Sequence, residues 1–469
     1  MFFRVKINED STYIWRIFFF MTTRVKQYIN SYTDSSPLAV FRIGFGLMML
    51  FSIVRFWNKG WIEKIYIEPS FHFKYYGFEW INSIGEGVYI LFILCALSAC
   101  FITLGFKYRP AIITFFLSFT YIELLEKTVY LNHYYFICVL SFLLIFLPLN
   151  SSFSLDNFIS KTKSISVPRW TIDSIKLMLC IVYIYAGLAK INSDWLIEAL
   201  PLKIWLPSKY DIPLIGETLM QENWVHFAMS WGGMLYDLLI PFLLLYKRTR
   251  TFAFLLVVFF HVFTRVLFPI GVFPYIMIIS ALIFFDAQFH KWIINILKII
   301  IDPISKKLSH INIQNVKFNS NKKIIWVLTI FFILQLTIPL RHLSYNGNIM
   351  WHEQGYRFSW RVMLMEKLGY TTFKIVDKDK NQFFYVQNED FLTSYQEKQM
   401  SFQPDFILEY AHFLGKHFKN QGYDDIAVYA DSYVSLNGRR NQRYIDPEID
   451  LLEIKDSFEN KKWILPLKK

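Results

Sequence analysis

Residues 36–57 read SPLAVFRIGFGLMMLFSIVRFW, an apolar run in which only Arg42 and Arg55 carry charge. At about 1.5 Å per residue, a helix of this length matches the roughly 30 Å hydrocarbon core of a bilayer. Gly44 and Gly46 fit the close packing of one membrane helix against another, so a nucleotide-binding glycine loop is not needed to explain them. The run predicts a membrane-crossing helix.

The composition of the whole chain agrees with a membrane protein. Of its 469 residues, 54% are hydrophobic and 19% aromatic, including 48 Phe and 28 Tyr. The net charge of +12 comes largely from basic residues in short gaps between apolar runs, which is a topology pattern and argues against nucleic-acid binding. All four cysteines lie inside apolar segments, without metal or disulfide spacing. No HExxH, paired CxxC or GxSxG motif occurs, so no metal site is predicted.

The same pattern repeats along the chain and predicts a polytopic α-helical membrane protein. Only FPIGVFP separates the seventh and eighth runs, which leaves open whether both cross fully or form a re-entrant turn. Nine spans are predicted, at 36–57, 84–105, 109–126, 130–149, 170–190, 225–246, 250–268, 270–287 and 322–340.

Nine spans place the two ends of the chain on opposite sides of the membrane. With a cytoplasmic N-terminus, the inner segments hold 20 Lys and Arg and the outer loops hold 7, as the positive-inside rule requires. Residues 1–35 are predicted to be a cytoplasmic segment with an amphipathic helix, and 302–321 a cytoplasmic linker. Residues 36–340 form the transmembrane domain. Residues 341–469 are predicted to be an extracytoplasmic mixed β/α domain, rich in strands, with a helix near 404–420.

This topology brings several polar side chains to the outer membrane face. Lys190 ends the fifth span in YIYAGLAKINSDWL, and His133 begins the fourth in EKTVYLNHYYF. His261 and Arg265 are four residues apart at the outer end of the seventh span, so they are expected to share a helix face. A lipid-soluble substrate and an aqueous one could meet there.

Each of these residues also has a structural explanation. Lys190 is either a snorkelling anchor or a base kept neutral by burial, and its position alone does not decide. His133 fits a hydrogen bond at a helix end, and His261 with Arg265 fits a structural pair. Asp237, inside the sixth span, is a functional candidate by default, although pairing with Arg42, Arg55 or Lys176 would account for it.

Several long motifs together resemble one family. They are RIGFGLMMLFSIVRFW, GWIEKIYIEPSFHFKYYGFEW, KTVYLNHYYF, YAGLAKINSDWL, LFPIGVFPY and RFSWRVM, in this order along residues 36–390. They resemble vitamin K-dependent gamma-glutamyl carboxylases and their bacterial relatives, of the horizontally transferred transmembrane domain group. The resemblance implies that reduced vitamin K (phylloquinone or menaquinone hydroquinone) is oxygenated to its epoxide, which drives carboxylation of a peptide glutamate with oxygen and carbon dioxide as co-substrates.

The resemblance also implies roles for individual residues. Lys190 would be the catalytic base, with His133 as its catalytic partner. The YRFSWRVM stretch would bind glutamate, and a helix there would place Arg357 and Arg361 on one face. Position and side-chain chemistry add to these roles: Arg357 and Arg361 are included because a guanidinium binds a carboxylate bidentately, and His261 and Arg265 because they lie at the outer face. The predicted quinone-binding residues are Asn132, Tyr135, His261 and Arg265, and the predicted glutamate-binding residues are Tyr356, Arg357, Trp360, Arg361 and Met363.

The implied setting is the bacterial inner membrane, with the C-terminal domain periplasmic. The implied partners are the lipid bilayer, a glutamate-containing peptide or protein, and a quinone reductase that supplies hydroquinone. Two features depart from the family pattern: Ala189 precedes the single lysine, and Met365 stands where a histidine is expected. The alternatives are therefore a quinone epoxidase without carboxylation, or a non-catalytic quinone- or lipid-binding protein. A transporter is disfavoured because the two halves show no internal symmetry.

Overall fold

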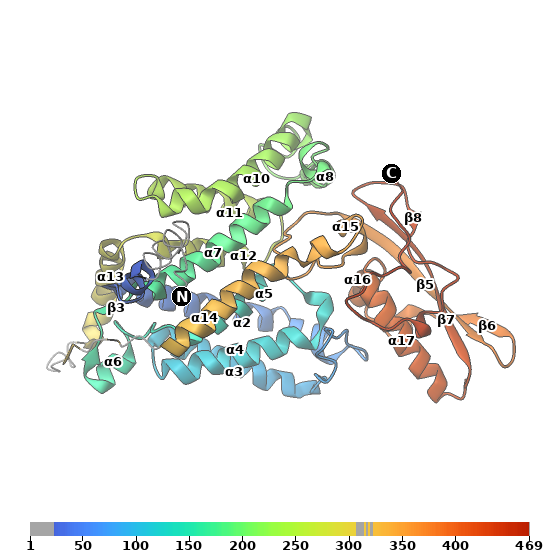
Figure 1. The fold of residues 1–469 in the computed structure, drawn as a ribbon, viewed down its shortest axis with the longest axis horizontal. Helices are drawn as coiled ribbons and strands as arrows, with labels where there is room; N and C mark the ends of the chain where they lie inside the picture. Colours follow the sequence, from blue (N-terminus) through green and yellow to red (C-terminus); the bar gives the residue numbers. More distant parts are fainter. Residues whose placement is uncertain (1–22, 306–313, 316–317, 319–321, 469) are drawn as a thin grey trace, which may run out of the picture.

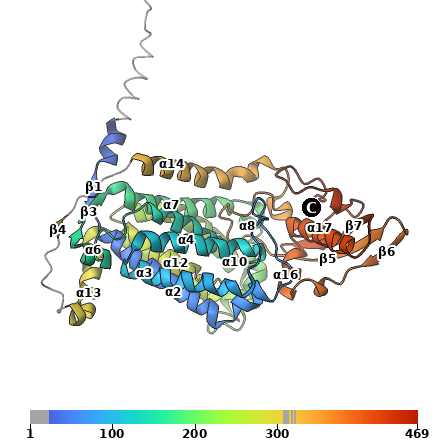
Figure 2. The ribbon, with the colours of Figure 1, turned by 90° about the horizontal axis from the view of Figure 1, so that it is seen from below.

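A bundle of helices carries a smaller strand-containing domain at one end (Figure 1). This computed structural model describes residues 23–305, 314–315, 318 and 322–468. The long helices run side by side from the N-terminal end of the bundle to the C-terminal domain (Figure 2). They are α2 (Ser36–Asn58), α3 (Val88–Leu104), α4 (Tyr108–Leu125), α5 (Asn132–Ile145), α7 (Arg169–Ala189), α10 (Asn223–Leu245), α11 (Arg250–Leu267) and α14 (Lys322–Thr337).

The prediction of a polytopic helical membrane protein is confirmed, but the prediction of nine spans is wrong. Within the described residues, six helices are long and apolar enough to cross a bilayer, or seven if one bent pair counts as a span. Helix α5 has 14 residues and would span only about 21 Å. Helix α4 contains Arg109 and Glu123, which lower its mean hydropathy. Both lie where spans were predicted, and both are packed into the core of the bundle by their buried faces.

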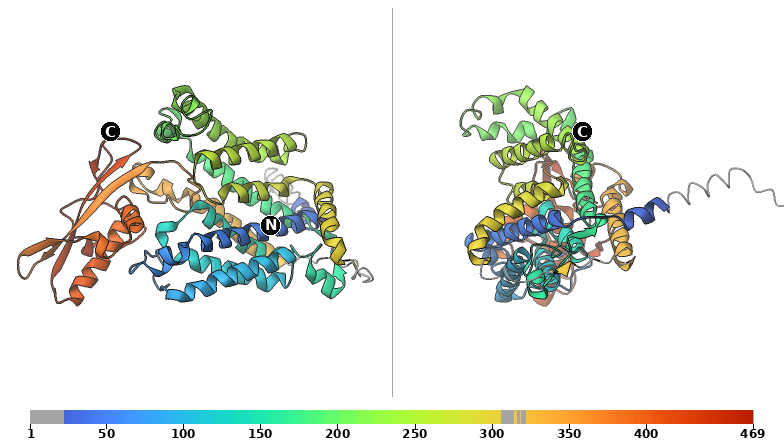
Figure 3. Two further views of the ribbon diagram at one scale, coloured as in Figure 1. Left: turned by 180° about the vertical axis from the view of Figure 1, so that it is seen from behind. Right: turned by 90° about the vertical axis from the view of Figure 1, so that its left-hand side faces the viewer.

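The bent pair replaces the predicted eighth span. Helix α12 (Phe273–Ala281) and the turn η6 (Leu282–Phe284) form an apolar segment that is shorter than α5 and does not cross a bilayer by itself. Helix α13 (Ala287–Ser305) then turns by 119° and lies across the end of the bundle that is far from the C-terminal domain (Figure 3). Lys291 of α13 pairs with Asp34 at 2.6 Å, which fixes this helix to the start of α2. No helix was predicted here, because residues 287–323 were expected to be an inner segment between the eighth and ninth spans.

Close packing of α2 on α3 depends on Gly46 of the opening motif, whereas Gly44 faces Ile279 of α12. A Cβ at Gly46 would lie 2.3 Å from Thr103 Oγ1, so only glycine permits this approach. Arg42 is fully buried and donates to the carbonyls of Ile102 at 2.8 Å and Thr103 at 2.7 Å. The guanidinium therefore satisfies carbonyl groups that are left free at the end of α3. It does not pair with Asp237.

The segments that flank the bundle are described only in part. Residues 23–29 are helical, and β1 (Tyr32–Asp34) pairs antiparallel with β3 (Ser166–Pro168). The predicted amphipathic helix falls mainly on residues 1–22, which lie outside the described residues. Most of the predicted linker 302–321 lies outside them as well.

The C-terminal domain is built on a four-stranded antiparallel sheet with the order β6-β5-β7-β8. Its strands are β5 (Lys367–Asp377), β6 (Gln382–Tyr385), β7 (Ile426–Leu436) and β8 (Gln442–Arg443). Alternating burial along β7 shows one face packed and one face partly exposed, as a half-buried strand requires. Helix α16 (Ser394–Met400) and helix α17 (Pro404–Asn420) cover the packed face. The predicted strands and the helix near 404–420 are present.

One hydrophobic cluster joins the C-terminal domain to the helix ends. It includes Ala189 at the end of α7, Trp195 of the short helix α8 (Ser193–Leu196) that follows, Leu267 at the end of α11, and Phe373 of the sheet. Asp194 adds an ion pair with the partly exposed Arg439, whose guanidinium lies 2.7 Å from the carboxylate. The domain therefore closes over the bundle end where α2, α7 and α11 finish.

Candidate functional site

Lys190 lies where α7 meets α10, at the end of the bundle below the C-terminal domain. Helices α7 and α10 approach closely because Gly187 has no side chain, and a Cβ there would lie 2.7 Å from Leu238 Cδ2. One turn further, the Lys190 Nζ donates to Asp237 Oδ2 at 2.7 Å and to the Ala186 carbonyl at 3.3 Å. Asp237 is thus paired with Lys190, and not with any of the three cations considered for it.

Both members of this pair are almost inaccessible to water. Lys190 is 6% exposed and Asp237 is 5% exposed. The ring of Trp195 lies 5.6 Å from Nζ and covers the pair from the side of the C-terminal domain. A buried ion pair must offset the loss of hydration of both charges. The short contact with Asp237 and the second hydrogen bond from Nζ to the Ala186 carbonyl contribute to that here.

The pair opens onto a small cavity of about 100 Å³. His261 also lines this cavity, and its Nε2 lies 3.3 Å from the Tyr183 hydroxyl. Arg265, four residues later, is exposed and does not line the cavity. His261 therefore points into the protein and Arg265 lies at its surface, although the two residues are only four apart on the helix.

His133 lines a second and larger cavity of about 730 Å³. Its Nε2 has no hydrogen-bond partner among the described residues, although the side chain is 7% exposed. The FPIGVFP turn forms one wall, where Gly271 adopts a positive φ of 63° close to the His133 ring. The Phe273 ring lies 6.0 Å from the His133 ring and 5.6 Å from the His261 ring. Four residues line both cavities: Ile270, Phe273, Val362 and Met363.

The YRFSWRVM stretch is an irregular loop and not a helix. Phe358, Trp360 and Met363 all have positive φ values, between 51° and 60°. Two side chains next to α5 hold this loop: the Tyr130 hydroxyl accepts from the Phe358 amide at 2.8 Å, and Asn132 Nδ2 donates to the Arg361 carbonyl at 2.9 Å. The expectation that Arg357 and Arg361 share a helix face is therefore wrong.

The loop distributes its predicted site residues among different surroundings. Met363 reaches both cavities. Trp360 is 1% exposed and packs on the ring of Tyr135 at 4.9 Å. Tyr135 in turn lines a third cavity, of about 520 Å³, and not the one that His133 lines. Tyr356 and Arg361 are not among the side chains that line the two site cavities.

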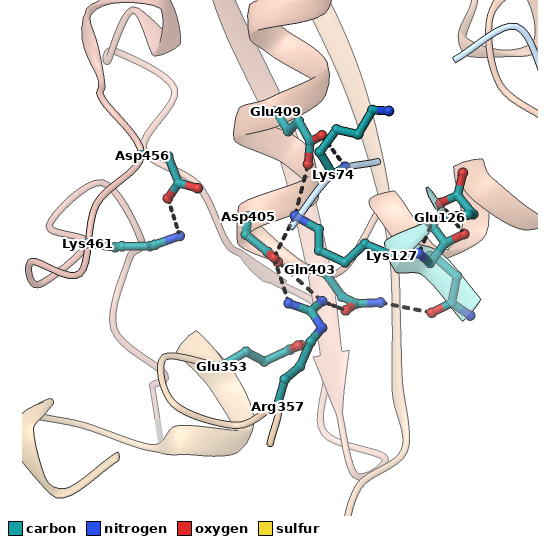
Figure 4. Close-up of polar contacts among 12 residues, drawn as sticks. Lys74, Glu126, Lys127, Glu353, Arg357, Gln403, Asp405, Glu409, Asp456 and Lys461 are labelled. Atoms are coloured by element: carbon teal, nitrogen blue, oxygen red, sulfur yellow. Dashed lines mark hydrogen bonds and ion pairs between the residues drawn. The ribbon is translucent and has the colours of Figure 1, made fainter. Parts of the chain in front are cut away.

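Arg357 belongs to a buried charge cluster between the bundle and the C-terminal domain (Figure 4). It pairs with Asp405 at 2.6 Å, and Lys127 pairs with Asp405 at 3.2 Å and with Glu409 at 2.9 Å. Burial by itself would raise the pKa of Asp405, but Arg357 and Lys127 hold that pKa well below its usual range. Arg357 is thus engaged in joining two parts of the protein.

Two residues of the large cavity were not selected from the sequence. Arg55, near the end of α2, lines it. Glu126, directly after α4, also lines it and is 1% exposed. The Glu126 carboxylate accepts from the Thr128 amide at 3.0 Å and from Gln396 Nε2 at 2.9 Å. The only sequence signal was charge next to apolar runs, which many loops share.

Burial raises the pKa of Glu126 to about 7, although Thr128 and Gln396 oppose the shift. Because this pKa lies above the usual value of 4.5, the folded state binds the proton more tightly than the unfolded state. The free energy of unfolding is therefore expected to fall by about 3 kcal/mol as the pH rises from about 4.5 to 7. Glu126→Gln should remove this part of the pH dependence in thermal unfolding, whereas the exposed Glu68→Gln should keep it. Parallel curves for native protein and Glu126→Gln would contradict the prediction.

No group of three or more His, Cys, Asp or Glu side chains that could hold a metal ion occurs among the described residues. The two cavities bring together an amine, a carboxylate, imidazoles and an apolar space. That combination suits proton transfer to or from an apolar ligand.

Two family descriptions match the chain. The HTTM domain matches residues 30–289. This range includes the FPIGVFP turn and the bundle helices that line both cavities. The lumenal domain of vitamin K-dependent gamma-carboxylase matches residues 320–469. No solved structure matches the chain. Because the first match alone covers more than half of its length, the chain belongs to the HTTM domain family, and it joins that domain to a lumenal domain of the gamma-carboxylase type.

Proposed function

We propose that this chain is an integral membrane enzyme that oxygenates a reduced naphthoquinone of the vitamin K type and couples that reaction to carboxylation of a peptide glutamate. The observation that carries the proposal is Lys190, a nearly inaccessible amine at the wall of an apolar cavity that adjoins the large cavity of His133. The family matches supply the cofactor and reaction class that this geometry would serve.

The large cavity fits a naphthoquinone. Its volume of about 730 Å³ lies within the range of roughly 300–1,000 Å³ typical of small-molecule sites. Its walls are largely apolar and aromatic, with Phe56, Tyr66 and Phe273 among them. The unpaired His133 Nε2 is free to form a hydrogen bond with a ring oxygen. Such a lining suits a ligand with an apolar ring system and a hydrogen-bonding oxygen atom.

The residues of the site have distinct tasks in this proposal. Lys190 accepts a proton from the hydroxyl group of the reduced quinone. This requires its amine in the neutral form, so the proton held in the Lys190–Asp237 pair must first pass from Nζ to Asp237 Oδ2, 2.7 Å away. Asp237 fixes the position of Nζ through the 2.7 Å hydrogen bond. His133 orients the quinone, and the C-terminal domain with Trp195 excludes water. When bound, the reduced quinone supplies, together with oxygen, the strong base needed to remove a γ-proton from glutamate before carbon dioxide adds.

The proposed setting is the bacterial inner membrane, with a cytoplasmic N-terminus and a periplasmic C-terminal domain. The described N-terminal residues and the C-terminal domain lie at opposite ends of the bundle (Figure 1), and the basic residues are concentrated on the predicted inner side. The quinone would enter from the bilayer and the peptide from the aqueous side. A quinone reductase would have to regenerate the hydroquinone.

One observation favours quinone epoxidation without carboxylation as the second candidate. Arg357, expected to bind the glutamate carboxylate, is already paired with Asp405. A glutamate peptide would therefore need another cation in or near the cavities. If no other cation binds the peptide glutamate, Lys190, His133 and the apolar cavities would still provide the residues that quinone oxygenation requires.

An assay with the purified chain separates these functions. The mixture contains vitamin K hydroquinone, oxygen, a glutamate peptide and labelled bicarbonate. We expect epoxide and labelled peptide to form together, and a matched glutamine peptide to stay unlabelled. Epoxide without label would leave the epoxidase. Hydroquinone binding with neither product would show a non-catalytic quinone-binding protein.

A further inference from the structure

Arg55 is a cation in the large cavity for which the described part of the chain provides no acid. It lies three residues before the end of α2, and its guanidinium stacks 4.8 Å from the Trp61 ring centroid. No ion pair or hydrogen bond joins this guanidinium to another described residue, and its side chain is half-buried at the cavity wall. Stacking on an aromatic ring leaves the N–H groups at the edge of a guanidinium free to bind an anion.

The other arginines of this region are engaged or lie elsewhere. Arg42 donates to three backbone carbonyls, and Arg357 pairs with Asp405. Arg361 is not among the side chains that line the large cavity. Of the basic side chains that do line it, Lys64 is exposed to solvent, so Arg55 is the one held at the wall by packing.

The acids of the cavity do not neutralise Arg55. Glu126 directs its carboxylate to Thr128 and Gln396, and Glu68 is exposed. The cavity therefore combines an apolar end near Phe273 and His133 with a cationic site at Arg55. Side chains of the C-terminal domain line the same space: Thr393, Tyr395 and Gln396. A ligand here can contact both parts of the protein.

We propose that Arg55, stacked on Trp61, binds the side-chain carboxylate of the peptide glutamate. The inference rests on the proposed function and names its substrate-recognition residue. A guanidinium binds a carboxylate through two parallel hydrogen bonds, which a glutamine amide cannot reproduce. The α16 side of the cavity places the peptide between the membrane helices and the C-terminal domain, so that its γ-carbon reaches the space in which the quinone ring is held by His133.

The test measures peptide binding without any quinone. A fluorescent peptide with one glutamate and its glutamine counterpart are titrated with the full-length protein in detergent, and anisotropy gives Kd for each. We expect the native protein to prefer the glutamate peptide by about tenfold or more, as a hydrogen bond to a charged group implies. Arg55→Gln should abolish the preference, and Arg55→Lys should retain part of it. Lys59→Gln removes an exposed cation that lies one turn further along and does not line the cavity, so it should keep the native preference.

The outcomes also separate two possible anions. An undiminished preference for glutamate in Arg55→Gln overturns the proposal. Weaker hydroquinone binding in Arg55→Gln, with the glutamate preference intact, overturns it too, because Arg55 would then serve the quinone oxygen. If carboxylation is absent while the Arg55-dependent preference is present, the proposed function fails and the anion site stands.

Discussion

Replacing Lys190 by alanine is expected to lower hydroquinone epoxidation by about a thousandfold or more. A positioned general base contributes roughly 10² to 10⁴ in rate, and within the described residues Lys190 is the only buried amine that lines either of the two adjoining cavities. It lines the smaller one, whereas Lys64 at the larger one is exposed. The neighbouring side chains are poor replacements, because the carboxylate of Asp237 is a weaker base than an amine and His261 Nε2 lies within hydrogen-bonding distance of the Tyr183 hydroxyl. Epoxide formation, followed by chromatography of the quinone products, measures the effect.

The structure also determines the controls. Lys190→Ala leaves the Asp237 carboxylate buried without a partner, so loss of activity could reflect damage to the fold. The double variant Lys190→Ala, Asp237→Asn removes that charge and should regain thermal stability without regaining activity. Small primary amines should partly restore epoxidation in the variants, with smaller amines better suited to the cavity. Near-native epoxidation in Lys190→Ala would make Lys190 an anchor only.

The sequence identified Lys190 because a charge at the end of an apolar run stands out locally. It could not identify the partner, because Asp237 is 47 residues away and three other cations were equally plausible. Pairing was decided by the absence of a side chain at Gly187, which lets α10 approach α7. That contact depends on the relative rotation of two helices, which single-sequence periodicity does not contain.

The YRFSWRVM stretch shows a different limit. Its two arginines are spaced for one helix face, and the helical reading followed from spacing alone. In the structure, positive φ values at Phe358 and Trp360 break any helix and send Arg357 toward Asp405. Non-glycine residues rarely adopt such φ values, so no sequence rule would have predicted them here. Tertiary hydrogen bonds from Tyr130 and Asn132 maintain the loop.

The prediction of nine spans was also wrong because tertiary contacts cannot be read from one sequence. Hydropathy found each apolar segment, but a helix inside a bundle need not reach across the bilayer by itself. Helix α5 is short because α4 and α5 are joined by a buried turn in which Glu126 and Lys127 are held by the C-terminal domain. The same turn places Glu126 at the cavity, and this is why that residue was missed.

Asp405→Asn is expected to lower the free energy of unfolding by about 3–5 kcal/mol, the largest loss of stability for a single change in the charge cluster of Figure 4. The carboxylate pairs with Arg357 at 2.6 Å and Lys127 at 3.2 Å, and these cations are only 15% and 5% exposed. The neutral amide leaves both charges buried with weaker partners. Lys127 follows α4 and Asp405 begins α17, so the loss falls on the contact between bundle and C-terminal domain.

Asp456→Asn is the matched control for this prediction. Asp456 pairs with Lys461 at 3.4 Å in the same region, but its side chain is 40% exposed, and exposed pairs contribute at most about 1 kcal/mol. Thermal unfolding in detergent compares the two variants, and limited proteolysis shows whether the C-terminal domain opens first. If Asp405→Asn unfolds like Asp456→Asn, the cluster does not hold the domain. Its docking would then rest on the hydrophobic cluster around Trp195 and Phe373, which would also have to keep water from Lys190.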